Sequence, residues 1–431
     1  MSGRPLHVCF VTANTFQFDA RTQRAARALA EDGHRVTVVA FEGPDLPAEE
    51  VDAGVRIVRP PLDRRIGSAF RPLPGPVRAA VGRALGLEPD AIALPPRGRG
   101  TAERFRGPLR RAAEVLAYRR RIGPWADAVL EVAGDADVFS AKALVALPVV
   151  HQAAGTAGTR FVYDVADLHV DSGRLARMPG PVRAYLRRRE REWVRDAAAL
   201  TAATGPLADE VAHRDSVARP TVILNCRPRW RPSEHRPPVS TRLREAAGIP
   251  AGRPILLYQG AFREDQGVEE LLPALDLPPL GDLDLAAVFL GFGRLEPRLR
   301  AAADARPGRI VILPEWTAGA DVAFVGAPPK TANLRLTIPN KLFESLMAGV
   351  PPIVAGSTAV GRLVAQIGAG RVVEPWSSAA IAEALGAMLK APARERQKAR
   401  AVARAAALDR YNWETERAGL LSVYRALADR G

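Results

Sequence analysis

Short apolar runs alternate with amphipathic stretches along most of the chain. The runs Val8–Thr12 and Val36–Ala40 enclose the segment Arg21–Asp32, in which apolar residues recur at helical spacing. Apolar runs of this length are typical of parallel strands that are buried on both faces. The order strand, helix, strand predicts a βαβ unit and therefore a doubly wound α/β sheet.

The rest of the first half continues this alternation around one irregular region. Residues 60–121 are rich in Arg, Pro and Gly, and only the stretch around Ala112–Arg120 has a helical pattern, so we interpret the region as an excursion from the fold. The proline-rich stretch from Arg227 to about Val239 predicts an interdomain linker, which makes residues 1–232 the first domain. Further strands are expected at 136–139, 160–164, 199–203 and 221–225, and a long helix at 181–195.

A second series of strands and helices follows the linker and predicts a second Rossmann-like domain, residues 240–410. The closing segment, residues 411–431, has an amphipathic pattern with Trp413, Leu420, Tyr424 and Leu427 on one face, which predicts a terminal helix. The strands expected in the second domain are 254–259, 285–290, 309–313, 320–325, 352–355 and 370–373. Its clearest helices are 267–274, 341–348 and 378–390, and a further helix is expected through Leu299.

The bulk properties of the chain suit a two-domain protein of the cytoplasm. Its 431 residues are enough for two domains of about 200 residues each. No run reaches the roughly 18 apolar residues of a membrane span, and the first residues lack the apolar core of a secretion signal. The two cysteines, Cys9 and Cys226, lie far apart in apolar segments, which argues against a disulfide framework and fits a reducing compartment.

The formal net charge of +14 admits three kinds of anionic partner: nucleic acid, an anionic membrane face or an anionic substrate. The excess is almost all arginine in an Ala-, Pro- and Arg-rich sequence, a composition that GC-rich coding also produces. The sequence has no zinc-finger spacing and no aromatic RNA-binding strand, so we expect no specific nucleic-acid binding. Residues 60–121 would suit peripheral contact with an anionic membrane, although a solvated surface is the plainer interpretation.

The segment Thr337–Val354 holds the strongest candidate chemistry, because ligands of open α/β sheets bind where strand ends meet helix starts. Asn340 and Glu344 are four residues apart in a predicted helix and share one face, where a carboxylate can accept both hydroxyls of a ribose. Lys341 and the helix start can bind phosphate, since backbone N–H groups and the helix dipole favour an anion there.

This segment resembles the C-terminal signature of the retaining glycosyltransferases of family four, and weaker similarities extend the resemblance over nearly the whole chain. These proteins have the fold called GT-B, in which two Rossmann-like domains face a cleft and a C-terminal helix crosses back to the first domain. The weaker similarities are Asp19–Arg21 with Gly33–His34, Tyr163–Asp167, Tyr258–Gly260 with Gly267–Val268, Gly291–Gly293 and Tyr411–Trp413.

The resemblance implies that a sugar passes from a nucleoside-diphosphate sugar to an acceptor with retention of configuration. It implies no separate cofactor, because the nucleotide sugar is itself the co-substrate, and the acceptors of such proteins range from glycans and lipids to specialised metabolites. The expected donor-binding residues are Gly260, Arg263, Gln266, Thr337, Ile338, Asn340, Lys341 and Glu344. The expected acceptor-side residues are Asn14, Asp19 and Arg21, and those expected near the reacting centre are Asp167, His169 and Arg263.

Three positions depart from the family pattern. Leu336 stands eight residues before Glu344, where the family has a first glutamate that touches the donor sugar. Gln266 stands where a Lys or Arg is expected, with Arg263 as the nearest basic residue, and Ala166 takes the place of a histidine. These departures favour an alternative hypothesis, in which a catalytically degenerate protein binds a nucleotide sugar or supports a partner enzyme.

Several of these residues also have plainer roles, and two glycine-rich stretches do not form known nucleotide motifs. Asp19 and Arg21 could pair with each other or cap a helix, and Asn340 could cap the next helix. The stretch Gly291–Gly293 lacks the third glycine of a dinucleotide fingerprint, and Gly356–Gly361 is not followed by the Lys of a P-loop, so a nicotinamide oxidoreductase is not expected. The sequence has no cluster with metal-ligand spacing, and we therefore expect metal independence.

Overall fold

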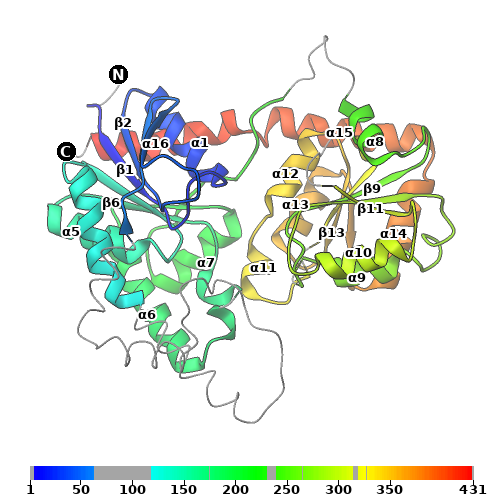
Figure 1. Ribbon diagram of the computed structural model, residues 1–431, viewed down its shortest axis with the longest axis horizontal. Helices are drawn as coiled ribbons and strands as arrows, with labels where there is room; N and C mark the ends of the chain where they lie inside the picture. Colours follow the sequence, from blue (N-terminus) through cyan, green and yellow to red (C-terminus); the bar gives the residue numbers. More distant parts are fainter. Residues whose placement is uncertain are drawn as a thin grey trace. The chain divides into compact units, whose positions relative to one another are not determined.

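The computed structural model describes residues 4–62, 118–173, 175–230, 239–264, 266–313, 319–326 and 328–429, and its contacts divide the chain into two compact units (Figure 1). Unit 1 consists of Met1–Thr201, Val211–Thr221 and Leu421–Gly431, and unit 2 of Ala202–Glu210 and Val222–Leu420. Residues 63–117, the greater part of the Arg- and Pro-rich excursion, lie outside the described residues, and so does most of the helix expected around Ala112–Arg120.

The first sheet has eight strands in the order β3-β4-β2-β1-β5-β6-β7-β8. All five residues of β1 are buried, as its apolar composition predicts, and β1 pairs in parallel with β2 and β5. The antiparallel hairpin of β3 and β4 at the edge was not expected; its turn places Ala53 and Gly54 at φ 50° and 78°, the backbone that tight hairpins require. The strands are β1 (His7–Val11), β2 (Arg35–Val39), β3 (Glu49–Asp52), β4 (Val55–Val58), β5 (Val138–Lys142), β6 (Arg160–Val165), β7 (Ala199–Ala202) and β8 (Thr221–Val222).

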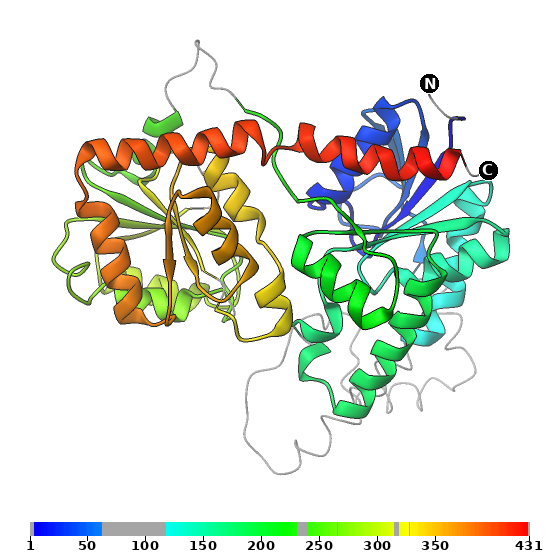
Figure 2. The ribbon, with the colours of Figure 1, turned by 180° about the vertical axis from the view of Figure 1, so that it is seen from behind.

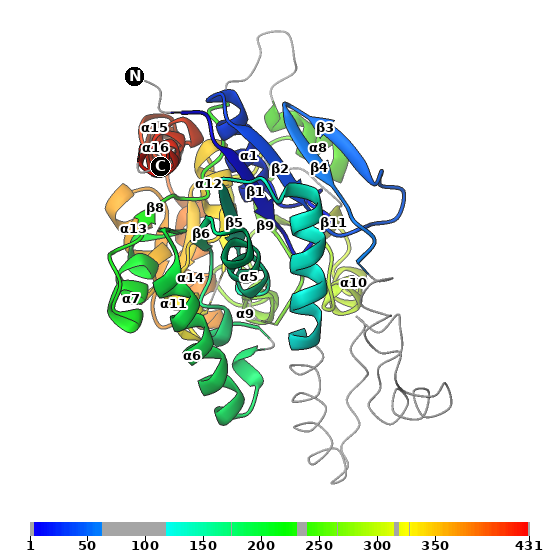
Figure 3. The same cartoon turned by 90° about the vertical axis from the view of Figure 1, so that its left-hand side faces the viewer.

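Helices cover this sheet. Helix α5 packs against β5 and β6, and α6 packs against α5 (Figure 3). The end of the last helix, α16, also belongs to unit 1: Tyr424 is 1% exposed, and its hydroxyl donates to Ser140 Oγ at 3.2 Å. Residues 118–133 are helical, and the other helical elements are α1 (Ala20–Glu31), α5 (Leu147–Ala157), η1 (His169–Asp171), η2 (Leu175–Arg177) and α6 (Gly180–Asp196), with α7 (Gly205–Asp215) and α16 (Trp413–Ala428) belonging partly to each unit.

The second sheet has six parallel strands in the order β11-β10-β9-β12-β13-β14. The chain builds outward from β9 to β11, returns to the other side of β9 with β12, and continues to β14. The strand order therefore reverses between β9 and β12, which is where open α/β sheets bind ligands. The strands are β9 (Ile255–Gln259), β10 (Ala286–Leu290), β11 (Ile310–Leu313), β12 (Val322–Val325), β13 (Pro352–Ala355) and β14 (Arg371–Val373).

The helices of unit 2 include four that the sequence analysis did not predict: α8, α11, α13 and α15. Helix α15, orange-red in Figure 2, packs against α12 and α13. Over the residues that the structure describes, no helix is long and apolar enough to cross a bilayer. The helices are α8 (Val239–Ala247), α9 (Val268–Ala274), α10 (Glu296–Asp304), α11 (Ala332–Leu336), α12 (Asn340–Met347), α13 (Ala359–Ile367), α14 (Ser378–Lys390) and α15 (Ala393–Asp409).

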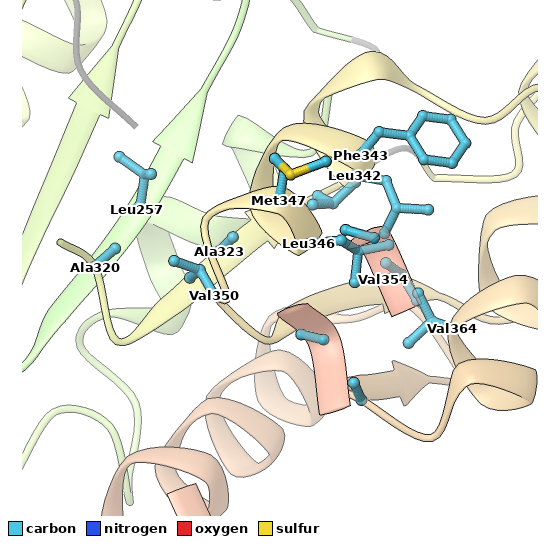
Figure 4. Close-up of a cluster of buried hydrophobic side chains, with 14 of the residues drawn as sticks. Leu257, Ala320, Ala323, Leu342, Phe343, Leu346, Met347, Val350, Val354 and Val364 are labelled. Carbon is cyan, nitrogen blue, oxygen red and sulfur yellow. The ribbon is translucent and has the colours of Figure 1, made fainter. Parts of the chain in front are cut away.

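The amphipathic helix α12 carries the strongest sequence candidates and is anchored by its apolar side. Leu342, Phe343, Leu346 and Met347 are each at most 4% exposed and belong to one hydrophobic cluster (Figure 4). Burying four such side chains stabilises the helix by several kcal/mol, on the order of 2 kcal/mol for each. The core therefore fixes which face of α12 remains for its polar residues.

A buried carboxyl group in unit 1 predicts a pH-dependent stability. Glu190 on α6 is 0% exposed, and burial raises its pKa to about 7 although the charge of Arg214 acts in the opposite direction. Between its ordinary pKa and pH 7 the unfolded chain therefore releases a proton that the folded chain keeps. We expect the free energy of unfolding to fall as pH rises through this window, by on the order of 1 kcal/mol per pH unit.

Urea denaturation of the wild type and of Glu190→Gln between pH 4.5 and 7.5 measures this effect. The neutral amide cannot titrate, so the variant should lose the slope that Glu190 contributes. Parallel pH profiles for the two proteins would show that Glu190 is ionised in the folded state.

Candidate functional site

Lys341 lies at the point where the strand order of the second sheet reverses. Its ammonium group donates to the carbonyl oxygen of Gly326, directly after β12, at 3.2 Å, and it lies 5.0 Å from the ring centre of Tyr258 on β9. The residue is only 9% exposed. A lysine charge is thus held beyond the ends of the two strands between which such sheets bind ligands.

Two glycines keep side chains away from these strand ends. Gly260 follows β9 and Gly291 follows β10, with φ angles of 131° and 142°. A Cβ atom on Gly291 would lie 2.1 Å from the carbonyl oxygen of Gly260, so no other residue fits there. A Cβ atom on Gly260 would lie 4.0 Å from Nζ of Lys341. The backbone beside the ammonium group is therefore bare, which permits a ligand to approach it closely.

Gln266, in the loop after β9, forms a hydrogen bond with Lys341. The Gln266 side-chain oxygen accepts from the Lys341 ammonium at 3.1 Å, and the Gln266 backbone N–H donates to the carbonyl of Arg263 at 3.2 Å. Arg263 itself is exposed on the same turn. The structure therefore brings Gly260, Gln266 and Lys341 together, and it shows what the unexpected glutamine does: it holds the lysine.

The polar face of α12 meets two residues that the sequence analysis did not single out. Arg227 Nη2 lies 2.5 Å from Oε1 of Glu344, and the Asn225 side-chain amide donates to the Asn340 side-chain oxygen. Both residues come from the stretch assigned to a strand end and a linker. The strand expected at 221–225 ends at Val222.

The structure also places the residues around the start of α12. The residue at the helix cap is Pro339, so Asn340 is not the cap, and among the described residues no side chain caps the start of α12. The Thr337 hydroxyl donates to the carbonyl of Asn333 at 2.9 Å, and Ile338 packs against the hydrophobic cluster. Leu336, which replaces a glutamate of the family pattern, ends α11.

In unit 1, Asp19 is the centre of a polar cluster after β1. It caps α1 by accepting from the backbone N–H of Thr22 at 3.2 Å, and it also accepts from the Asn14 amide at 3.1 Å and from the Lys142 ammonium group. Burial alone would raise the pKa of Asp19, but the charge of Lys142 and these hydrogen bonds together hold it below its ordinary value. Lys142, at the end of β5, is a residue that the sequence analysis missed.

Arg21 pairs with Asp164, the next-to-last residue of β6. The two side chains form a bidentate ion pair at 2.6 and 2.7 Å, and the Thr201 hydroxyl donates to the same carboxylate at 2.7 Å. Burial alone would raise the pKa of Asp164, but the charge of Arg21 and the hydrogen bonds hold it below its ordinary value. Asp19 and Arg21 thus have distant partners from β5 and β6.

His169 opens the short helix η1 after β6. Burial lowers the pKa of its imidazole, and Lys142 acts in the same direction, whereas Asp167 and Asp164 act against it. Its Nε2 atom is buried and, within the described structure, has no hydrogen-bond partner. A neutral imidazole with an unpaired nitrogen can exchange a proton or a hydrogen bond with a ligand. Ala166, which takes the place of a histidine in the family pattern, has no polar side-chain group and cannot exchange a proton or a hydrogen bond with a ligand.

The described residues contain no group of three or more His, Cys, Asp or Glu side chains that could hold a metal ion.

Comparison with known proteins identifies structures of similar fold, all of low sequence identity among those described below. No model of a known protein family matches the sequence, and no curated protein matches it either. The structure is similar to sucrose-phosphate synthase from Thermosynechococcus elongatus, with a TM-score of 0.73 and 15% identity, over 99% of this chain and 100% of the other.

Two further solved structures agree. HepE of Anabaena, in complex with UDP-glucose, has a TM-score of 0.65 and 15% identity, over 98% of this chain and 100% of the other. WaaG, a glycosyltransferase involved in lipopolysaccharide biosynthesis, has a TM-score of 0.62 and 17% identity, over 96% and 99%. The expected fold class is confirmed: an α/β chain with two parallel-sheet Rossmann-like domains, of the type called GT-B.

Proposed function

We propose that the protein is a glycosyltransferase that moves a sugar from a nucleoside-diphosphate sugar to an acceptor, with retention of configuration. The observation that carries the proposal is the buried Lys341 ammonium group, held over β9 and β12 beside the bare backbone of Gly260. A fixed cation next to side-chain-free backbone suits the diphosphate of a nucleotide sugar.

The donor is held by unit 2. Lys341, Arg263 and the start of α12 stabilise the negative charge that builds on the departing diphosphate, which is the principal electrostatic demand of the reaction. Glu344 accepts the ribose hydroxyls, one helical turn away on the same helix. Gln266 fixes the lysine, and Asn340, Thr337 and Ile338 are the further donor-side residues of this proposal.

The acceptor side of the proposal belongs to unit 1: Asn14 and Asp19 in the polar cluster after β1, Arg21 in its pair with Asp164, and Asp167 and His169 after β6. An acceptor hydroxyl attacks the anomeric carbon on the face that the diphosphate leaves. The bond from the anomeric carbon to the phosphate oxygen breaks as the new glycosidic bond forms, and the departing phosphate takes the hydroxyl proton. Neither a metal ion nor a cofactor enters this proposal.

Thermal denaturation with UDP, GDP, ADP and their glucose conjugates tests the donor site. A ligand that binds the folded state raises the melting temperature by mass action, so we expect one base series to raise it by several degrees. Glu344→Ala should abolish the rise, whereas Glu383→Ala, on the exposed side of α14, should preserve it. Equal shifts in both variants would remove Glu344 from the donor site.

The alternative is a catalytically degenerate protein that binds a nucleotide sugar without transferring it. It is supported by Leu336 and Gln266, which stand where the family pattern has a glutamate and a basic residue. Slow hydrolysis of the nucleotide sugar in the absence of an acceptor separates the two proposals, since water can replace an unknown acceptor. Release of free sugar supports the transferase. Nucleotide-sugar binding without release of sugar, either to water or to a panel of glycan, lipid and small-molecule acceptors, supports the degenerate protein.

A further inference from the structure

The segment after β8 is fixed by hydrogen bonds to the start of α16 and by two side chains in the core of unit 2. The Leu224 backbone N–H donates to Glu416 at 2.7 Å, and the Arg227 carbonyl accepts from the Trp413 backbone N–H at 2.9 Å. Leu224 and Cys226 are 8% and 0% exposed and belong to the hydrophobic cluster of unit 2. Asn225, between these two residues, is only half-buried, and Arg227, after Cys226, is exposed, so these two side chains point away from this core.

The two outward side chains meet α12 one helical turn apart. Asn225 donates to Asn340, and Arg227 pairs with Glu344, four residues further along the helix. The Glu344 side chain is 14% exposed and that of Arg227 is 45% exposed. The carboxylate is thus largely covered, while the guanidinium group that holds it stays in contact with solvent.

We propose that Arg227 is a positioning residue for nucleotide recognition: it holds the Glu344 carboxylate in the orientation that accepts ribose hydroxyls. The proposal rests on the proposed function, in which Glu344 binds the ribose. A carboxylate has two oxygens with about four acceptor positions, and the observed contact joins one guanidinium nitrogen to Oε1. The second oxygen can therefore accept from a ribose while Arg227 remains bound, and Arg227 selects ribonucleotides over nucleotides that lack these hydroxyls.

The opposite role would make Arg227 a competitor that leaves Glu344 when the nucleotide binds. The geometry points to holding, because the Arg227 backbone is fixed at its carbonyl and at the buried Cys226 beside it. The two roles predict opposite results. Removal of a holder weakens ribonucleotide binding, and removal of a competitor strengthens it.

The test is the ratio of the dissociation constants of a 2′,3′-dideoxynucleoside diphosphate and the matching ribonucleoside diphosphate, measured by calorimetry for UDP, GDP and ADP. The wild type should prefer the ribonucleotide by about tenfold or more, since hydroxyl bonds to a charged group are lost in the analogue. Arg227→Ala should reduce the preference to about twofold, and Arg227→Lys should restore most of it. Arg227→Ala combined with Glu344→Ala should behave as Glu344→Ala alone.

Arg229→Ala is the matched control, because Arg229 belongs to the same segment but its side chain donates to the carbonyl of Leu408. It should keep the wild-type ratio. If Arg227→Ala left the ratio unchanged, with or without equal weakening of both kinds of ligand, the inference would be wrong. Tighter ribonucleotide binding in this variant would also overturn it, and both results would leave the proposed function standing. A wild type that binds none of the six ligands would overturn the proposed function and the inference with it.

Discussion

Lys341→Met is expected to weaken the binding of a nucleoside diphosphate by roughly 30- to 150-fold, the largest loss of any single substitution in the proposed donor site. A charge-assisted hydrogen bond to phosphate in a partly buried position contributes about 2–3 kcal/mol, and each 1.4 kcal/mol is a factor of ten. The Lys341 ammonium is fixed by Gly326 and Gln266, so little ordering is left to be done when the ligand arrives. Calorimetric titration with UDP, GDP and ADP measures the loss.

The matched control is Lys330→Met, which removes the same charge from the same unit. The Lys330 side chain is 53% exposed and pairs with Glu270 at 3.1 Å, so its removal should change the dissociation constant less than threefold. The corresponding nucleosides provide a second control, since Lys341→Met should bind them as the wild type does. If the variant lost nucleoside and diphosphate affinity equally, Lys341 would act on the fold of the loop and not on phosphate.

Asp164→Asn is expected to lower the free energy of unfolding by about 3–4 kcal/mol, the largest stability effect that we predict. The carboxylate is 17% exposed and its partner Arg21 is 10% exposed, so the substitution leaves a poorly solvated guanidinium group without its counter-charge. Urea denaturation at neutral pH measures the change. The exposed pair of Arg27 and Asp52 is the control, and Asp52→Asn should cost less than about 1 kcal/mol.

The difference in free energy of unfolding between the wild type and Asp164→Asn should become smaller as the pH falls. Because the folded pKa of Asp164 is lower than the unfolded one, the pair contributes its full stability above about pH 4 and loses it as pH falls through the folded value. The difference between the wild type and the variant should therefore narrow in acid. A difference that stayed constant down to pH 2.5 would mean that packing, and not charge, carries the effect.

Local patterns in the sequence determined most of the elements. Val8–Thr12 and the expected strand at 352–355 are short apolar runs between polar stretches, and the structure places strands there. The pattern failed where a segment has no periodicity of its own. Strand β3 is mostly polar, with exposed or half-buried residues throughout, so it is defined by its pairing with β4 at the sheet edge.

The sequence also predicted which residues of α12 share its polar face. The spacing of Asn340 and Glu344 predicts that they share a side of α12, and the buried apolar residues of that helix confirm which side is left. Periodicity is a local property, since each residue's direction follows from its neighbours three and four positions away. What a helix presents to solvent can therefore be derived from its own residues.

The tertiary structure decided which residues that lie far apart in the sequence form ion pairs. Arg21 and Asp164 are 143 positions apart, and Lys142 and Asp19 are 123 positions apart. The sequence of one segment does not indicate its partner segment. The two residues of each pair come together because of the strand order in the sheet and the lengths of the connections between strands. The same holds for Arg227, whose sequence context indicates a linker and whose backbone is fixed beside Glu344 by the buried Cys226 and by a hydrogen bond from Trp413. The sequence by itself thus determined the two α/β halves and the polar face of α12, whereas folding decided which charges meet there.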